Sequence, residues 1–488
     1  MASVTARHTM AILMQRLKWP VPMVRWRAAR EIRGLLQSDK TRADMTAELL
    51  NFLDLCTTES DVCSVLCLLF LTESKARPSR DEVVERVKCP SILADILIEK
   101  TFGPGAELGG WESAHSGEAP GWFEPDKYFL DHKGAHIPPT FYNELGKIER
   151  STGLPLRHQW AWEWHNLRER LGTRLTSYAH YFDEYGDTQS GVKGQYLQRQ
   201  TEIFRSAHIR TFAFAVSEWG MPLRLAGDYM LEHVPAVGGI FDLDLNPKPD
   251  ALRDLPKKAS ADGSDLEGVL AEWVEANRNV EMPAVSFKTP TPLDLAKYGD
   301  VTVGAYFVSP GFVMREDHGP FEPMDFTLIT NSLTIDGVVR DVKADDMKRD
   351  GKAGWCVPVC SSLFPMPYGF WSSDYFAIGL PLVTPYCLDE ESIIRAKAGA
   401  LELTSRDALL SRTRIWNDVW TPSYVGGGQT RCGAIAELEK AKFKDLPNRA
   451  PEGSKLAWYI ETRIWKRATE HGEYAMEKRR ALIMDDVV

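Results

Sequence analysis

The spacing of apolar residues changes along this 488-residue chain, and that change limits its fold more than any other feature. Over about the first hundred residues, apolar positions recur every three or four residues, which is typical of helices that bury one face. From about 240 to 385 the apolar runs are short or alternating and are broken by Pro and Gly, as in AVSFKTP and VTVGAYFVSP. Such runs are typical of strands. We therefore expect an α+β fold.

The same patterns predict the domain organisation. A chain of this length exceeds a single hydrophobic core, so roughly two to four domains are expected. We expect N-terminal helical repeats, a Gly/Pro-rich loop, a helical aromatic-rich region, a β-rich domain and a mixed C-terminal region, over 1–100, 101–137, 138–238, 239–388 and 389–488 respectively. The last region is expected to end in a long amphipathic helix over 454–480, with Leu456, Tyr459, Ile464 and Trp465 as candidate packing residues.

Two N-terminal segments carry similar helical patterns. In MVRWRAAREIRGLL the apolar positions begin at Val24, and in DVCSVLCLLF they begin again at Val62, an offset of 38 residues. This offset lies within the range of helix-pair repeats. With Pro in the preceding turn, WPVPMVRWRAAREIRGLL resembles a HEAT repeat, and the resemblance extends over about 100 residues. It implies helix pairs that need a neighbour against which to bury their apolar faces.

The segment HQWAWEWHNLRER, from His158, holds two histidines and three tryptophans. In a helix His158 and His165 lie two turns apart, about 10 Å along the axis, which is too far for both to bind one zinc ion. A helix places Trp160 and Trp164 on one face. A strand would place Trp160, Trp162 and Trp164 together as a surface on which a base or ring could stack. A core helix is the favoured interpretation, and a stacking site is the alternative.

The charge of the chain is distributed unevenly. The net charge is −10, which excludes a general electrostatic attraction to nucleic acid. Residues 1–42, however, hold nine Lys and Arg against two acids. Arg25, Arg27, Arg30 and Arg33 are therefore the candidate residues of a nucleic-acid-binding module. A solvated helix face is the more common role of such a pattern.

One acidic segment resembles a nuclease motif. PMDFTLITNSLTIDGVVRDVK contains Asp325 and ends in Asp341-Val-Lys343 behind two valines. This arrangement resembles the PD-(D/E)xK nucleases, and the resemblance implies that Asp325 and Asp341 hold Mg²⁺ while Lys343 assists the attacking water. Met324 stands where the pattern has Asp, and Asp341 stands where Glu is usual.

Other motifs argue against common catalytic classes. The sequence contains no phosphate-binding loop, no GxSxG motif and no CxxC pair. The eight cysteines show no regular framework and are expected to be reduced thiols of a cytoplasmic protein. The longest apolar run, VLCLLFL, has seven residues, far too few to span a membrane. We expect no metal or cofactor, apart from Mg²⁺ under the nuclease alternative.

These observations favour a binding role. The segments CPSILADILIEK and EIFRSAHIRTFAFAVSEWGMP resemble the accessory and sensor parts of prokaryotic defence proteins. We therefore expect a non-enzymatic recognition or scaffold subunit of a larger intracellular complex, with protein partners. The alternatives are the Mg²⁺-dependent nuclease and the nucleic-acid-binding module.

Overall fold

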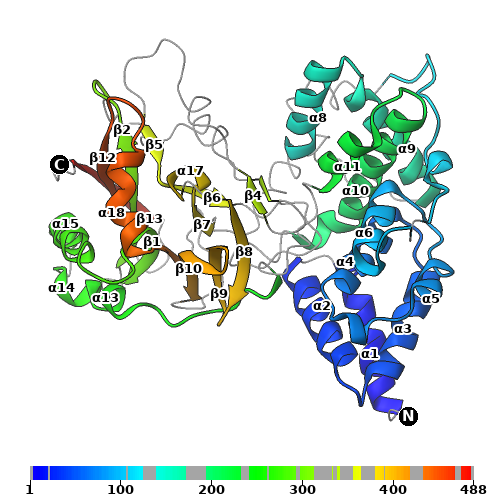
Figure 1. The fold of residues 1–488 in the computed structure, drawn as a ribbon, viewed down its shortest axis with the longest axis horizontal. Helices are drawn as coiled ribbons and strands as arrows, with labels where there is room; N and C mark the ends of the chain where they lie inside the picture. The colour runs from blue at the N-terminus through cyan, green and yellow to red at the C-terminus, as the bar shows by residue number, and fades with distance from the viewer. Residues whose placement is uncertain are drawn as a thin grey trace. The chain divides into compact units, whose positions relative to one another are not determined.

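The described chain forms two compact units, each held together by contacts among its own helices and strands (Figure 1). Unit 1 extends up to Leu231, and unit 2 begins at Phe241. The computed structural model describes residues 4–19, 22–105, 108–124, 139–171, 194–231, 241–260, 263–292, 297–312, 332–333, 338–340, 356–363, 380–388, 391–417, 432–467 and 474–484. Helices make up unit 1 and strands dominate unit 2, so the expected α+β class is confirmed.

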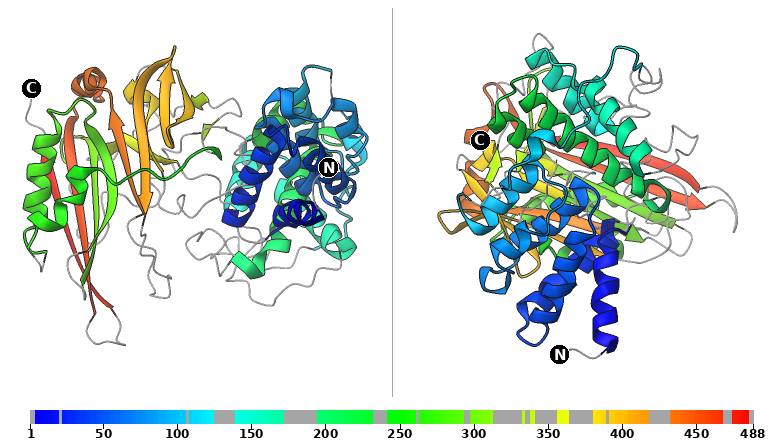
Figure 2. Two further views of the ribbon diagram at one scale, coloured as in Figure 1. Left: turned by 90° about the horizontal axis from the view of Figure 1, so that it is seen from below. Right: turned by 90° about the vertical axis from the view of Figure 1, so that its right-hand side faces the viewer.

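Unit 1 is a bundle of helices around one central helix. Its helices are α1 (Val4–Arg16), α2 (Pro22–Gln37), α3 (Arg42–Asp54), α4 (Glu59–Phe70), α5 (Arg80–Val84), α6 (Ile92–Phe102), α8 (Pro139–Thr152), α9 (Leu156–Leu171), α10 (Gly194–Ser217) and α11 (Leu223–Leu231). The central helix is α10, which packs against α4, α6, α9 and α11 (Figures 1 and 2). Its side chains Phe204, Phe212 and Phe214 are fully buried.

The sequence explains why α4 lies inside unit 1. Thr58 begins the helix by accepting a hydrogen bond from the Asp61 N–H, and every residue from Glu59 to Leu69 is buried. A helix that is apolar on nearly all sides is stable only with neighbours around it. Cys63 and Cys67 pack in this core, and burial raises the pKa of the Cys63 thiol to about 12. This thiol therefore remains protonated at neutral pH.

Unit 2 is built on a wide antiparallel sheet. Its strands are β1 (Ala284–Pro292), β2 (Lys297–Val308), β3 (Ser332–Leu333), β4 (Val338–Arg340), β5 (Cys356–Pro358), β8 (Ser392–Lys397), β9 (Ala400–Ser405), β10 (Ala408–Asn417), β11 (Cys432–Leu438), β12 (Lys455–Arg467) and β13 (Tyr474–Met484). The strand order is β13-β12-β2-β1-β11-β10-β9-β8-β4-β3. The short β5 pairs with β2 at Tyr306–Val308, beyond the last residue of β2 that pairs with β1, Gly304.

A second, two-stranded sheet and several helices pack on the large sheet. The small sheet consists of β6 (Cys360–Leu363) and β7 (Leu380–Val383). The helices are α13 (Asp250–Arg253), α14 (Leu255–Lys258), α15 (Leu266–Asn277), α17 (Pro385–Leu388) and α18 (Lys440–Arg449). Helix α15 packs against β12 and β13 (Figures 1 and 2).

Register determines which side chains form the core under α15. Phe287 of β1 lies opposite Val303 of β2, which in turn lies opposite Ile460 of β12, so the three residues form one row on one face. The Trp273 ring of α15 meets Phe287 edge-on at 4.7 Å between centroids. All three sheet residues are no more than 1% exposed. Cross-strand apolar rows of this kind are the unit from which sheet stability is built.

Two tight turns connect β8, β9 and β10. Lys397 pairs with Ala400 around a two-residue loop, and Ser405 pairs with Ala408 around another. Both loop residues have positive φ in each case, namely Ala398 and Gly399, then Arg406 and Asp407. This conformation is that of type I′ turns, whose twist matches that of the flanking strands. The turns lack the usual Asn-Gly signal, so the local sequence does not predict this pair of hairpins.

The prediction of a long amphipathic helix over 454–480 is wrong. The described part of this segment forms β12 and β13, which pair antiparallel along eleven residues each. Leu456, Ile460 and Ile464 fit helical spacing, but they also alternate along one face of a strand together with Trp458. Pairing of β12 with β2 decides between the two patterns, because it buries both Trp458 and Ile460 completely.

Trp416 and Gly433 face each other across β10 and β11. A Cβ atom added at Gly433 would lie 2.2 Å from the Trp416 ring, which is itself 1% exposed. Gly433→Ala should therefore lower the free energy of unfolding of unit 2 by about 1–3 kcal/mol through overpacking. Urea unfolding measures this loss. Gly268→Ala is the matched control, because Gly268 lies in α15 with open space around it, and it should be neutral or stabilising. Equal effects of the two substitutions would contradict the packing argument.

Candidate functional site

Helix α9, which contains the HQWAWEWHNLRER segment, has two different aromatic faces. Trp160 and Trp164 point inward, 0% and 3% exposed, and lie 5.8 and 6.5 Å from the Phe204 ring of α10 between centroids. Trp160 and Trp164 therefore lie on one face of the helix, as predicted from their spacing. Trp162 lies on the other side of the helix and is only partly buried.

The outward face of α9 carries a cluster of five rings. His158, Trp162 and His165 contribute from the helix, and Trp122 and Phe123 contribute from the loop over residues 108–124, which comes before α8 in the chain. Phe123 is central, with centroids 4.9 Å from Trp162 and 5.6 Å from His165. Trp122 meets Trp162 edge-on at 5.8 Å and is 73% exposed. We call these five residues the Trp122 cluster.

Backbone and side-chain hydrogen bonds attach the loop to α9. The Ser116 N–H and hydroxyl donate to the two carboxylate oxygens of Glu163, each at 2.8 Å. Gln159 donates to the Gly117 carbonyl at 2.8 Å, and the Trp162 indole donates to the Ser116 carbonyl at 3.3 Å.

A further contact lies near the end of the loop, where His158 Nε2 is 3.3 Å from the Phe123 carbonyl oxygen. Because a carbonyl oxygen can only accept, this hydrogen bond requires the His158 proton to be on Nε2. The loop that carries Trp122 is thus fixed at several points.

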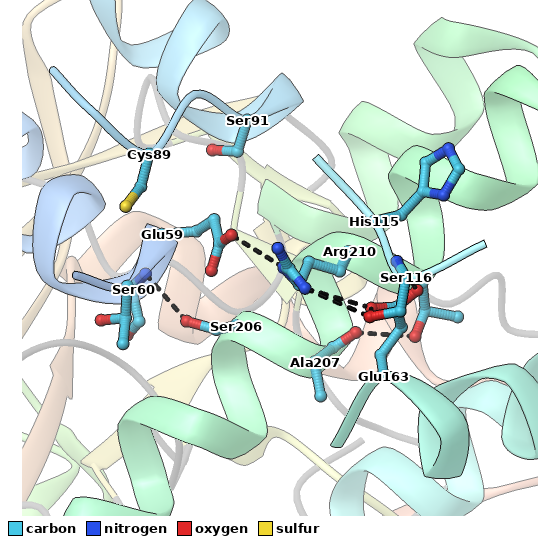
Figure 3. A network of polar contacts seen from close by, with 12 residues as sticks. Glu59, Ser60, Cys89, Ser91, His115, Ser116, Glu163, Ser206, Ala207 and Arg210 are labelled. Carbon is cyan, nitrogen blue, oxygen red and sulfur yellow. Dashed lines mark hydrogen bonds and ion pairs between the residues drawn. The ribbon is translucent and has the colours of Figure 1, made fainter. Parts of the chain in front are cut away.

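Beneath these contacts lies a buried ionic network (Figure 3). Arg210 of α10 donates through Nε to Glu59 of α4 at 2.8 Å. Its Nη1 donates to the Glu163 carboxylate at 3.4 Å and to the Ser116 hydroxyl at 3.3 Å. Glu59 is 2% exposed and Glu163 is fully buried. One guanidinium therefore joins α4, α9, α10 and the loop.

Burial and charge act in opposite directions on this network. Burial raises the pKa of Glu163, although hydrogen bonds from Ser116 and the charge of Arg210 counteract the increase. Burial alone would lower the pKa of Arg210, but the charges of Glu59 and Glu163 outweigh it and hold the pKa above its ordinary value. Desolvation disfavours a charged form and an opposite charge favours it, so each group depends on its partners to remain ionised.

The arrangement is suited to positioning the loop. Glu163 accepts hydrogen bonds from Ser116, Gln159 and Arg210, and its full burial keeps it from any ligand in solvent. The nearby Cys89 thiol has a pKa raised to about 11 by burial, so it is protonated at neutral pH and a weak nucleophile. The accessible chemistry of the site is the aromatic surface of the Trp122 cluster.

The four candidate arginines of α2 do not share one free surface. Arg25 is buried at 3% exposure, Arg30 lies 4.7 Å over the Trp26 ring, and Arg33 donates to the Leu71 carbonyl at 3.5 Å. Arg27 alone among them is exposed. Three of the four side chains are therefore engaged within unit 1.

The candidate nuclease residues Asp325, Asp341 and Lys343 lie outside the described residues. Within the described part of the chain, no group of three or more His, Cys, Asp or Glu side chains is placed to hold a metal ion. None of the described helices is long and apolar enough to cross a membrane.

Sequence reasoning missed the ionic network entirely. Glu163 stands between two tryptophans of the segment that drew attention for its rings, and Arg210 stands in the apolar run HIRTFAFAV. A charged residue inside such a run is the available signal, because charges are rarely buried without a partner. The identity of the partner has no local signal.

Comparisons with known proteins found no matching protein family, no matching curated protein and no matching solved structure.

Replacing Arg210 tests the network. Arg210→Met should lower the free energy of unfolding of unit 1 by about 3–5 kcal/mol, because Glu59 and Glu163 are left as buried carboxylates without their cation. Amide hydrogen exchange over residues 108–124 should also become faster. Arg224→Met, at an exposed position on α11, is the matched control and should change stability by less than about 0.5 kcal/mol. Unchanged exchange in the loop of Arg210→Met would contradict its attachment through Ser116.

Glu163 should also give unit 1 a specific pH dependence. Because its pKa is higher folded than unfolded, Glu163 contributes most to stability below its ordinary pKa of 4.5, and this contribution is lost as pH rises through the folded-state value. Glu163→Gln cannot titrate. The free energy of unfolding of the wild type minus that of Glu163→Gln should therefore decrease from pH 4.5 toward neutrality in urea unfolding. An increase over this range would show that the sign is wrong.

Proposed function

We propose that this protein is a non-enzymatic recognition subunit that binds another protein within a larger intracellular complex. The observation that supports the proposal best is Trp122, 73% exposed on a loop that is attached to buried groups. Aromatic side chains are enriched at protein interfaces, and the Trp122 ring lies in a cluster of five rings.

The physical argument rests on the energetics of binding. Trp is among the residues most enriched where truncation to alanine costs an interface at least about 2 kcal/mol. A fixed side chain loses little conformational entropy on binding, so more of its buried area contributes to affinity. The Trp122 cluster meets both conditions, because Phe123 and Trp162 hold the Trp122 ring edge-on and leave its surface open.

We further propose that α1 to α4 form HEAT-like pairs on which partners can also dock. Neighbouring helices pack on one another in this region, α1 on α2 and α3, and α2 on α3 and α4. Helix α3 also packs on α4, and packing between neighbouring helices supports the proposal, because each helix pair of a repeat needs a neighbour. Membership of a prokaryotic defence assembly, suggested by the resemblance of two segments, belongs to the same proposal.

The two alternative functions, a nuclease and a nucleic-acid-binding module, are each tested by a separate experiment. Plasmid cleavage with Mg²⁺ by the wild type but not by Lys343→Ala would favour the nuclease. Salt-sensitive retention on heparin would favour the nucleic-acid-binding module. The engagement of Arg25, Arg30 and Arg33 within unit 1 gives the second alternative little support.

Trp122→Ala tests the proposed function. Proteins that co-purify with the tagged native chain should be lost or reduced at least about tenfold, because an anchoring ring is removed. The stability of unit 1 should change little, since the side chain is mostly exposed. Trp19→Ala is the matched control, because Trp19 is 48% exposed elsewhere in unit 1. Quantitative mass spectrometry makes the comparison, and an identical set of co-purifying proteins for Trp122→Ala and wild type would count against the proposal.

A further inference from the structure

The two ends of the large sheet differ. At one end the strands β4 and β3 have only three and two residues. At the other end β13 has eleven residues, each paired with a residue of β12, and within the described chain it pairs with no other strand. An edge strand presents a row of backbone N–H and C=O groups that another extended chain can pair with. A two-residue strand offers no comparable template.

The side chains of β13 and β12 build a positive surface beside this edge. Glu461 accepts hydrogen bonds from Tyr459 at 2.7 Å, Arg463 at 2.6 Å and Arg480 at 3.2 Å, and Lys478 lies 3.2 Å from it. This carboxylate thus lies among three cations, and Asp300 of β2 lies opposite Arg463 in the register, which leaves a formal excess of one positive charge. The Glu461 side chain is 9% exposed, whereas Lys478 and Arg463 are 29% and 43% exposed. The buried acid orients Lys478 and Arg463, which remain accessible, whereas the Arg480 side chain is only 7% exposed.

A third cation of β13 lies on the opposite face. Arg479 donates to Glu477 at 2.8 Å and to the Ser264 carbonyl at 2.9 Å, and its side chain is 34% exposed. Residues 478–480 are therefore three consecutive cations along the edge. The next three residues, Ala481 to Ile483, are apolar.

The charges oppose pairing of β13 with a second copy of itself. In an antiparallel pair related by a twofold axis, a residue at the centre lies opposite its own copy. When all eleven residues of β13 pair, the centre lies at Arg479, so Arg479 faces its own copy and Lys478 faces Arg480, and these like-charge pairs are destabilising. The same charges favour an acidic strand.

We propose that the outer edge of β13 binds an extended acidic segment of a partner protein, which adds to the sheet as a further strand. The inference rests on the proposed function, namely that the chain acts by binding proteins, and it supplies the chemistry of one partner. Residues opposite each other in a sheet share a face, so the added strand should place three acids opposite residues 478–480 and three apolar residues opposite 481–483. Nucleic acid lacks the backbone amide pattern that an edge strand pairs with.

Synthetic peptides provide a direct test on the full-length protein. The sequence SVIVEDETS satisfies the pattern in the antiparallel direction, and its reversed sequence satisfies it in the parallel direction. One of the two should bind in isothermal titration calorimetry and slow amide hydrogen exchange over residues 474–484. The charge-reversed peptide SVIVKRKTS should bind at least about tenfold more weakly, because it faces three cations.

A modified peptide separates strand addition from simple charge attraction. The binding peptide with alternate backbone nitrogens methylated keeps every charge but cannot donate to the edge. It should lose binding. Equal binding of the methylated peptide, or equal binding of a single-stranded oligonucleotide without slower exchange in β13, would overturn the proposal, as would the absence of binding by both acidic peptides.

Substitutions in the protein complete the test. Lys478→Gln together with Arg479→Gln should weaken peptide binding about tenfold. Lys455→Gln, an exposed lysine at the far end of β12, is the matched control and should bind like the wild type. If the double variant unfolds, the methylated peptide still decides the question. The assay uses no cellular partner, so its failure is distinguishable from failure of the proposed function, which appears as unchanged co-purification with Trp122→Ala.

Discussion

The arrangement of unit 1 depends on the buried guanidinium of Arg210. Taking a charge out of water costs several kcal/mol, and that cost is offset only when partners surround the charge. Glu59 and Glu163 supply them from two other helices, at 2.8 and 3.4 Å. An apolar core alone would tolerate sliding of α10 against α4 and α9, whereas directional hydrogen bonds between buried charges permit few positions.

The same interactions connect the core to the surface. Glu163 accepts hydrogen bonds from Arg210 in the interior and from Ser116 of the loop. The position of Glu163 therefore fixes the beginning of the segment that ends in Trp122 and Phe123. The rings of α9 hold the end of that segment. A loop residue therefore gains the fixed geometry usually found on helices and strands, which is the condition under which an exposed ring is an effective binding group.

The sequence was informative where periodicity is local and unambiguous. It predicted the two-faced helix over the tryptophan segment and the strands β1 and β2. It failed over 454–480 because Leu456 and Ile464 fit one face of a helix and also one face of a strand, whereas Tyr459 and Trp465 lie on the other face of β12. The deciding contact is with β2, more than 140 residues earlier. The ionic network was missed for the same reason: Arg210 and Glu59 lie 151 positions apart. Neither residue has a neighbour in sequence that identifies its partner.

The large sheet shows two ways of placing charge on strands. Across β8, β9, β10 and β11, Arg395, Glu402, Arg412 and Glu437 lie opposite one another in turn, so each cation in the row faces an acid. Cross-strand pairs of this kind satisfy charges within the sheet. On one face of β12 and β13, Glu461 faces three cations, namely Arg463, Lys478 and Arg480. Interior strands have neighbours on both sides that can supply the opposite charge, whereas an edge strand has one. The excess positive charge therefore lies beside the one long strand of the described sheet that has a single neighbour, and the proposed acidic strand would add opposite charge and backbone hydrogen bonds at this edge.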